Sequence, residues 1–200
     1  HADGTDVALP ATADTVDVLI HNEEGSGPDL SSGPLAIDSQ GMPHLVYTVN
    51  DEGSSRLYLA TPARESGWDN VDLTSFFPSF VQGWGTNLAM GGGMTFDLSG
   101  RATILTAVFK LNASGRVIRE EWGHPSTEIV RLWSDDGLKI FASEVLSPID
   151  EGRAHWLANI ERPTGHHQVP EDPGIIYTAG GPGAGLADLG MENCVMWLSC

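Results

Sequence analysis

The feature that most constrains the fold of this chain is the lack of helical periodicity between regularly spaced turn signals. Apolar and β-branched residues occur in short runs, which clusters of Gly, Pro, Asn, Asp and Ser interrupt about every 8–12 residues. No segment repeats apolar residues at the interval of about 3.6 that an amphipathic helix requires. We therefore predict an all-β chain of antiparallel meanders, with less than about 10% helix.

The stretch Pro34–Trp68 shows this pattern most clearly. Leu35–Ile37 ends one strand, and His44–Val49 is a second strand rich in β-branched and aromatic residues. Arg56–Ala60 alternates polar and apolar residues, as a half-buried strand does. Asp38–Gly41 forms the first turn, because its glycine can adopt a positive φ without steric cost. Two or three paired strands are expected here.

Part of the unit recurs along the chain. Ile37–Gly41 is echoed by Phe96–Gly100, and an apolar run follows each of them. The offset of about 59 residues is within reach of one repeat of a multi-strand blade. A third turn of related type is Trp133–Gly137. The recurrence predicts several β-meanders built on one plan.

We expect residues 1–200 to form a single all-β domain with a loop-rich lead-in over residues 1–33. Other short apolar runs predict further strands, some of them paired as hairpins. These runs are Val16–His21, Thr103–Leu111, Gly115–Trp122, Glu128–Trp133, Leu138–Val145, Gly174–Thr178 and Cys194–Leu198. The chain begins at His1 without Met, so we expect either a processed protein or a piece of a longer one.

Charge and hydropathy limit the possible partners. The formal net charge is -17, from 27 acidic and 10 basic residues. Such a surface repels nucleic acid, so no nucleic-acid partner is expected. No apolar run approaches the roughly 20 residues that cross a bilayer, so no membrane partner is expected either. The acidic surface fits solubility, and a cation-binding role is the alternative.

The two cysteines, Cys194 and Cys200, are predicted not to bond to each other. If Asn193–Leu198 is one strand, a rise of about 3.3 Å per residue separates their Cα atoms by about 20 Å. A disulfide requires less than about 7 Å. Cysteine usage therefore does not fix the redox compartment.

Two groups of motifs resemble a known family. The segment Asp38–Tyr47, with sequence DSQGMPHLVY, resembles the D-x-x-G-x-P-H-φ-φ-Y unit of secreted proteins with bacterial-neuraminidase-type repeats. Trp156–Arg162, Ile176–Thr178 and Asn193–Trp197 are similar to the closing blades of the repeat family that includes ulvan-type polysaccharide lyases. The resemblance spans roughly residues 34–200.

The resemblance implies a secreted β-propeller protein that acts on polysaccharide. The family's propellers are about twice this length, so the chain corresponds to about three or four C-terminal blades. Missing N-terminal blades or another chain would then complete the ring, because an open arc leaves strand edges bare. A β-sandwich is the alternative fold. Ser134–Phe141 is close to the sialidase Asp-box but has Leu138 where that box has glycine, which disfavours a sialidase.

The activity that the resemblance implies is β-elimination on a uronate-containing polysaccharide. This reaction needs a base, an acid for the leaving oxygen and a cation that neutralises the carboxylate. His44, Tyr47, Arg56 and Tyr58 lie in one meander and supply these residue types. In an extended strand, however, His44 and Tyr47 point to opposite faces, so both reach one cleft only across a bulge. Ordinary strand packing is the alternative role.

A second constellation follows residue 154. The substrate-binding residues that we predict are His155, Asn159, Glu161 and Arg162. A metal site could use His155, His166 and His167, with Glu161 as a further ligand. The resembled lyases carry a structural zinc, so zinc or calcium is a possible structural ion, whereas no cofactor is required for the reaction. A solvated loop is the alternative here.

Two functions follow from these observations. One is a polysaccharide lyase acting by β-elimination. The other is a non-catalytic module that binds glycans or proteins. A net negative chain binds an anionic polymer only through a locally basic cleft. The placement of the arginines therefore distinguishes the two functions.

Overall fold

The computed structural model describes residues 5–6, 9, 11–12, 17–20, 27–51, 54–63, 67–86, 88, 91–111, 126–149, 152–180 and 193–198. The described part of the chain is all-β, as predicted, and its strands pair in antiparallel sheets, none of them closed into a barrel. Its helical elements are the short 3-10 turns η1 (Leu73–Phe76) and η2 (Ser79–Val81).

The first sheet is a four-stranded meander. Its strands are β1 (Asp29–Ile37), β2 (Pro43–Asp51), β3 (Ser54–Pro62) and β4 (Trp68–Asp72). They lie in the sheet in the order of the sequence. The predicted strands within β2 and β3 are confirmed, because period-2 alternation and β-branched residues identify half-buried strands well.

β1 begins earlier than the sequence indicates. Residues 29–32, expected to be loop, pair with β2. The register shifts between Ser32 and Leu35, where the strand contains Gly33 and Pro34. A bulge of this kind accommodates a proline, which cannot donate to the ladder. The shift also breaks the alternation that would have marked a strand.

The second sheet is built around β7 (Ala102–Phe109). β5 (Gly85–Thr86) and β6 (Gly92–Phe96) pair with successive stretches of one edge of β7. β8 (Thr127–Ser134) pairs with the other edge, and β9 (Ala142–Val145) follows it. Apart from the break between β5 and β6, this sheet is again a meander.

The third sheet has three strands in sequence order. They are β10 (Ala154–Ile160), β11 (Ile175–Gly180) and β12 (Asn193–Leu198). Cys194 is a free, exposed cysteine on the extended β12, whereas Cys200 lies outside the described residues. The extended conformation that underlies the cysteine prediction is therefore present.

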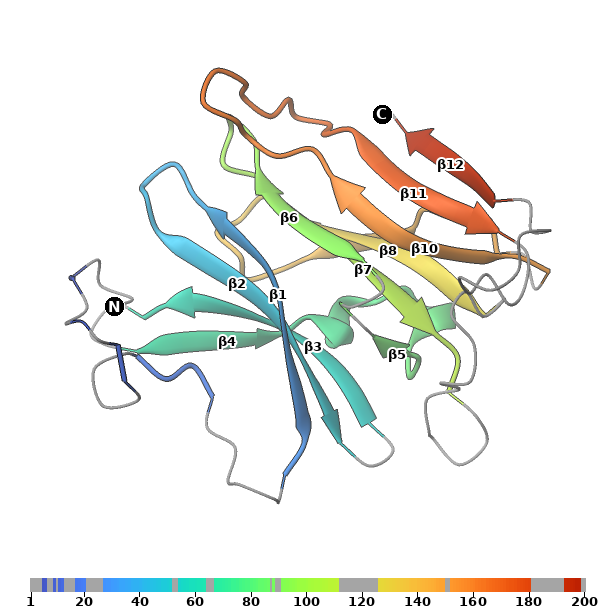
Figure 1. Cartoon of the computed structure of the whole chain (residues 1–200), viewed down its shortest axis with the longest axis horizontal. Coiled ribbons are helices and arrows are strands. Elements are labelled where there is room, and N and C mark those ends of the chain that lie inside the picture. Colours follow the sequence, from blue (N-terminus) through green and yellow to red (C-terminus); the bar gives the residue numbers. More distant parts are fainter. Residues whose placement is uncertain are drawn as a thin grey trace.

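The second sheet lies between the other two (Figure 1). One of its faces, with Ile104 and Leu132, packs on the first sheet. Its other face, with Leu105 and Ile129, packs on the third sheet. Every residue of β7 is buried, which explains its nearly continuous apolar sequence.

The first long strands of the three sheets are neighbours. β6 contacts both β1 and β10 (Figure 1). Gly91, just before β6, forms a parallel bridge with Ala158 of β10. A Cβ atom on Gly91 would lie 2.5 Å from the backbone nitrogen of Ala158, so only glycine permits this approach. All three sheets therefore meet at the junction of β1, β6 and β10.

The recurring turn is confirmed at corresponding places in the first two sheets, between β1 and β2 and between β6 and β7. The backbone of Asp38 is bonded to Met42 and Gly41, and the backbone of Asp97 makes the same two bonds to Arg101 and Gly100. The side chain of Asp38 also accepts bonds from the turn, at 2.8 Å from the Met42 nitrogen. Burial alone would raise the pKa of Asp38, but bonds from Met42, His44 and Gln40 together lower it.

Two predicted strands differ from the structure, and a third lies outside the described residues. Residues 17–20 of the segment Val16–His21 are not in a strand, and both ends of that segment lie outside the described residues. Gly115–Trp122 lies wholly outside the described residues. The described strand that pairs with β7 on the edge opposite β5 and β6 is β8. In Leu138–Val145 only the last four residues form a strand, because Gly137 and Leu138 both adopt a positive φ, 75° and 71°, in the preceding turn.

Candidate functional site

A pocket of about 590 Å³ opens where the three sheets meet. We call it the junction pocket. The pocket is lined by residues of β1, of the segment that leads into β6, and of β10 and the loop after it. They include Ser32, Gly33, Gly91, Gly92, Asn159 and Arg162. Because each of the three sheets contributes to the lining, the pocket exists only when all three are packed together.

Arg162 brings a positive charge to the junction pocket. Its Nη2 donates to Asn159 Oδ1 at 3.2 Å, and the same oxygen accepts from the backbone nitrogen of Ile160 at 3.0 Å. Within the described residues, Arg162 has no carboxylate partner. Its guanidinium is therefore not in an ion pair, and most of its N–H donors are free to bind a ligand.

An irregularity in β10 sets the position of Asn159. The pairing register with β11 shifts between Trp156 and Asn159, and Leu157 has a φ of 53°. A bulge re-aims the side chains that follow it. A positive φ is unusual for leucine and persists only where the surrounding structure holds the backbone in place. Here the bridge from Gly91 to Ala158 does so.

The loop after β10 holds an acid–base pair next to Arg162. His167 Nε2 lies 2.5 Å from Glu161 Oε1, and Glu161 Oε2 accepts from the Gly174 nitrogen at 2.9 Å. The bond from Gly174 and, after it, the His167 contact lower the pKa of Glu161 despite the opposing effect of desolvation. His166 is exposed in the same loop. Glu161 is thus a carboxylate that orients an imidazole.

His155 lies elsewhere, in the interior between the second and third sheets. Its Nδ1 is 2.9 Å from Glu128 Oε2, and the exposed fractions of the two side chains are 4% and 2%. The hydroxyl of Ser147 donates to the same carboxylate oxygen. The ring of Tyr177 packs edge-on against His155, and burial followed by the charge of Glu128 raises the pKa of Tyr177. His155 is therefore not brought together with Asn159 and Arg162.

The predicted catalytic meander is divided between the two faces of the first sheet. His44 is buried, 3.1 Å from Asp38 Oδ2, and its ring packs against Phe96 of the second sheet. Tyr47 and Tyr58 stack on each other at 5.3 Å, and β2 pairs with β3 without a register shift. The bulge that would turn His44 and Tyr47 toward one cleft is absent from this pairing.

Arg56 lies in a second pocket, away from His44. Its Nη1 donates to Asp72 Oδ2 at 2.7 Å. The bond to Asp72, its charge and the nearby Tyr58 raise the pKa of Arg56. The structure thus places Arg56 near Tyr58 but brings neither of them to the junction pocket.

The predicted metal ligands do not converge. His155 is bonded to Glu128, while His166 and His167 lie in the exposed loop. Across the described segments, no group of three or more His, Cys, Asp or Glu side chains has an arrangement that could hold a metal ion. The zinc or calcium site therefore stays a prediction from the resemblance.

Sequence reasoning did not identify the small residues that shape the junction pocket. Gly91–Gly93 looks like a flexible stretch in the sequence, and it lacks the features of a phosphate loop. In the structure Gly91 and Gly93 allow β10 to approach β6 closely, and Gly92 lies against Leu105 of β7. Three consecutive glycines at the start of a strand are the signal that could have indicated a close backbone approach.

Comparison with known proteins adds no family assignment. No protein-family model matches the chain, and no curated protein matches it. Among the described residues, no helix has the length and apolar character needed to span a membrane.

Proposed function

We propose that the three sheets are consecutive blades of a β-propeller. Three observations support this architecture. The sheets are meanders that follow the order of the sequence, β6 of the second sheet lies beside the first strands of the other two, and a D-x-x-G turn recurs in two of them. Radial repetition of such meanders around their inner strands generates a propeller. The remaining blades would come from other parts of a longer chain or from another chain.

We propose further that the protein binds an acidic polysaccharide at the junction pocket. The observation that carries this proposal is the unpaired guanidinium of Arg162 on the wall of a pocket of about 590 Å³. A guanidinium presents a planar fork of donors that matches a carboxylate or a sulfate. Ser32 and Asn159, which also line the pocket, can hydrogen-bond to sugar hydroxyl groups.

Of the five arginines that the structure describes, Arg162 alone combines a place in the lining of the junction pocket with the lack of a carboxylate partner. Arg153 also lacks such a partner within the described residues, but it lines neither of the two pockets. Arg56, Arg101 and Arg131 each pair with a carboxylate, that of Asp72, Asp135 or Glu144. In a chain of net charge -17, a basic group readily finds a neighbouring acid that neutralises it. A cation without an acidic partner, placed in a pocket, favours an anionic group against the repulsion of the whole surface.

Arg162→Gln should weaken binding of an acidic polysaccharide by about tenfold or more, because a charge-assisted contact would be replaced by a neutral one. Alginate, polygalacturonate and a sulfated galactan would be titrated calorimetrically at low salt. The matched control is Arg153→Gln, which removes an exposed arginine just before β10 that does not line the pocket, and it should leave binding unchanged. Equal losses in the two variants would indicate a dependence on net charge alone, and would contradict a site at Arg162.

A second candidate function is β-elimination beside the junction pocket, whose lining includes Arg162 but neither Glu161 nor His167. The observation that favours it is the Glu161–His167 pair beside Arg162 in the chain. The arginine could neutralise a uronate carboxylate, and the imidazole held by Glu161 could accept the proton α to it. As the bond from C4 to the glycosidic oxygen breaks, the imidazolium so formed could return that proton to the leaving oxygen. This differs from the predicted catalytic set, because His44 is buried against the second sheet, on the other face of β2 from Tyr47.

Elimination would create a conjugated, 4,5-unsaturated uronate that absorbs ultraviolet light. Each polymer bound by the protein would be followed for this absorbance with the wild type and with His167→Ala. Loss of a general base should lower the rate by about 10²–10⁴-fold while the polymer is still bound. Binding without any gain in absorbance would contradict β-elimination and support the non-catalytic binding function.

A further inference from the structure

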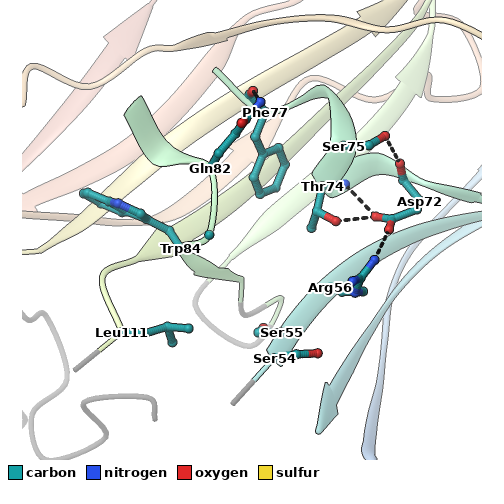
Figure 2. A pocket seen from close by; sticks show the side chains of 11 residues that line it. Ser54, Ser55, Arg56, Asp72, Thr74, Ser75, Phe77, Gln82, Trp84 and Leu111 are labelled. Atoms are coloured by element: carbon teal, nitrogen blue, oxygen red, sulfur yellow. Dashed lines mark hydrogen bonds and ion pairs between the residues drawn. The ribbon is translucent and has the colours of Figure 1, made fainter. Parts of the chain in front are cut away.

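A second pocket, of about 370 Å³, lies between the first sheet and the segment that leads into β5 (Figure 2). We call it the Trp84 pocket. Its walls include Arg56 of β3, Asp72 at the end of β4, and Gln82 and Trp84 from the connection after η2. No residue of this pocket also lines the junction pocket.

One wall of the Trp84 pocket is aromatic. The backbone nitrogen of Trp84 donates to the Val81 carbonyl at 3.1 Å, which fixes the residue after η2. The indole is only half-buried, and the ammonium of Lys110 lies 5.4 Å from its ring centroid. A cation over an indole helps to hold the ring in place. Phe77 and Leu111 extend the apolar part of the lining.

The wall opposite Trp84 carries paired charges (Figure 2). Arg56 donates to Asp72 at 2.7 Å, and Asp72 also accepts from the Thr74 backbone nitrogen at 3.0 Å. The side chain of Arg56 remains 55% exposed, so it keeps donors for a ligand. The amide nitrogen of Gln82 donates to the Phe77 carbonyl at 3.3 Å, which leaves its second N–H and its oxygen for a ligand.

The charge balance indicates what this pocket can bind. Its two charged lining residues are a base and an acid already paired with each other. An anion would have to compete with Asp72 for Arg56, and a cation would have to compete with Arg56 for Asp72. A ligand with no charge, several hydroxyl groups and one apolar face would meet both the paired charges and the indole. A neutral pyranose has these properties, since one face of its ring exposes C–H groups.

We infer that the Trp84 pocket is a second carbohydrate site, which takes a neutral pyranose unit. The pyranose ring packs on the indole face of Trp84 that the Lys110 ammonium does not cover, and its hydroxyl groups bind Arg56, Asp72 and Gln82. The inference does not depend on the acidic-polysaccharide proposal, because the two pockets share no residue. Together, the two sites would bind an acidic sugar in one pocket and a neutral sugar in the other.

The test uses neutral methyl pyranosides of glucose, galactose, mannose and xylose with the full chain. Binding would be measured by saturation-transfer NMR and by titration of chemical shifts, into the millimolar range expected for a single sugar. At least one probe should bind the wild type, and Trp84→Ala should weaken that binding by about tenfold. Trp84→Phe should retain part of it, because an aromatic face remains.

Two controls separate this site from general effects. Trp197→Ala removes another tryptophan, which is 63% exposed on β12, and Arg153→Gln removes an exposed arginine that lines neither pocket. Neither should change the binding of a neutral probe. Arg56→Gln offers a second disruption of the pocket if Trp84→Ala does not fold. Failure of all four probes to bind the wild type would overturn the inference, as would unchanged binding by folded Trp84→Ala and Arg56→Gln variants.

Discussion

His155→Ala is expected to lower the free energy of unfolding by about 3–5 kcal/mol, because it leaves the buried carboxylate of Glu128 without its histidine partner. The two side chains are 2.9 Å apart and almost wholly inaccessible to water. Ser147 alone cannot compensate a charge in this interior position. Urea unfolding, followed by near-ultraviolet circular dichroism, measures the change.

His167→Ala is the matched control for this prediction. It removes the histidine of another Glu–His pair, but that pair lies in an exposed loop, where water replaces the lost contact. Its unfolding midpoint should stay close to that of the wild type. Similar losses for both variants would show that the Glu128–His155 contact is not isolated from solvent. The comparison therefore tests whether the third sheet is packed on the second.

How much of the fold could be predicted depends on how far apart the interacting residues lie in the sequence. The strands within β2 and β3 follow from local alternation, and the Asp38–Gly41 turn follows from its residue types. The start of β1 is hidden by a register shift at Gly33 and Pro34. Packing of the second sheet between two others depends on long-range contacts that no local pattern encodes.

The residues of the candidate site also divide into those that the local sequence indicates and those that only long-range packing brings together. Asn159 and Arg162 are polar residues at the end of an apolar strand, and their residue types alone indicate a binding role. Their partners in the pocket, Ser32 and Gly91, are far away in sequence and have no chemistry that marks them. Proximity in sequence groups His44 with Tyr47, but the two-residue period of a strand separates them.

Gly91→Ala should lower the free energy of unfolding by about 2–5 kcal/mol, from backbone strain and displacement of β10. Gly91 has a φ of 102°, which is unfavourable for alanine. The new methyl group would also lie 2.5 Å from the Ala158 nitrogen and 2.7 Å from the Leu157 carbonyl carbon, both of which belong to the backbone. Relief of this overlap requires β6 and β10 to move apart.

Gly41→Ala separates the two causes, because Gly41 also has a positive φ, 83°, but no atom lies within 4 Å of the place that its new methyl group would take. It should lose only the strain, about 1–2 kcal/mol, and bind acidic polysaccharide as the wild type does. Gly91→Ala should lose more stability and, in its folded fraction, bind more weakly, since Arg162 and Asn159 would be displaced with β10. Equal losses of stability in the two variants, with unchanged binding, would show that the junction pocket does not depend on the close approach at Gly91.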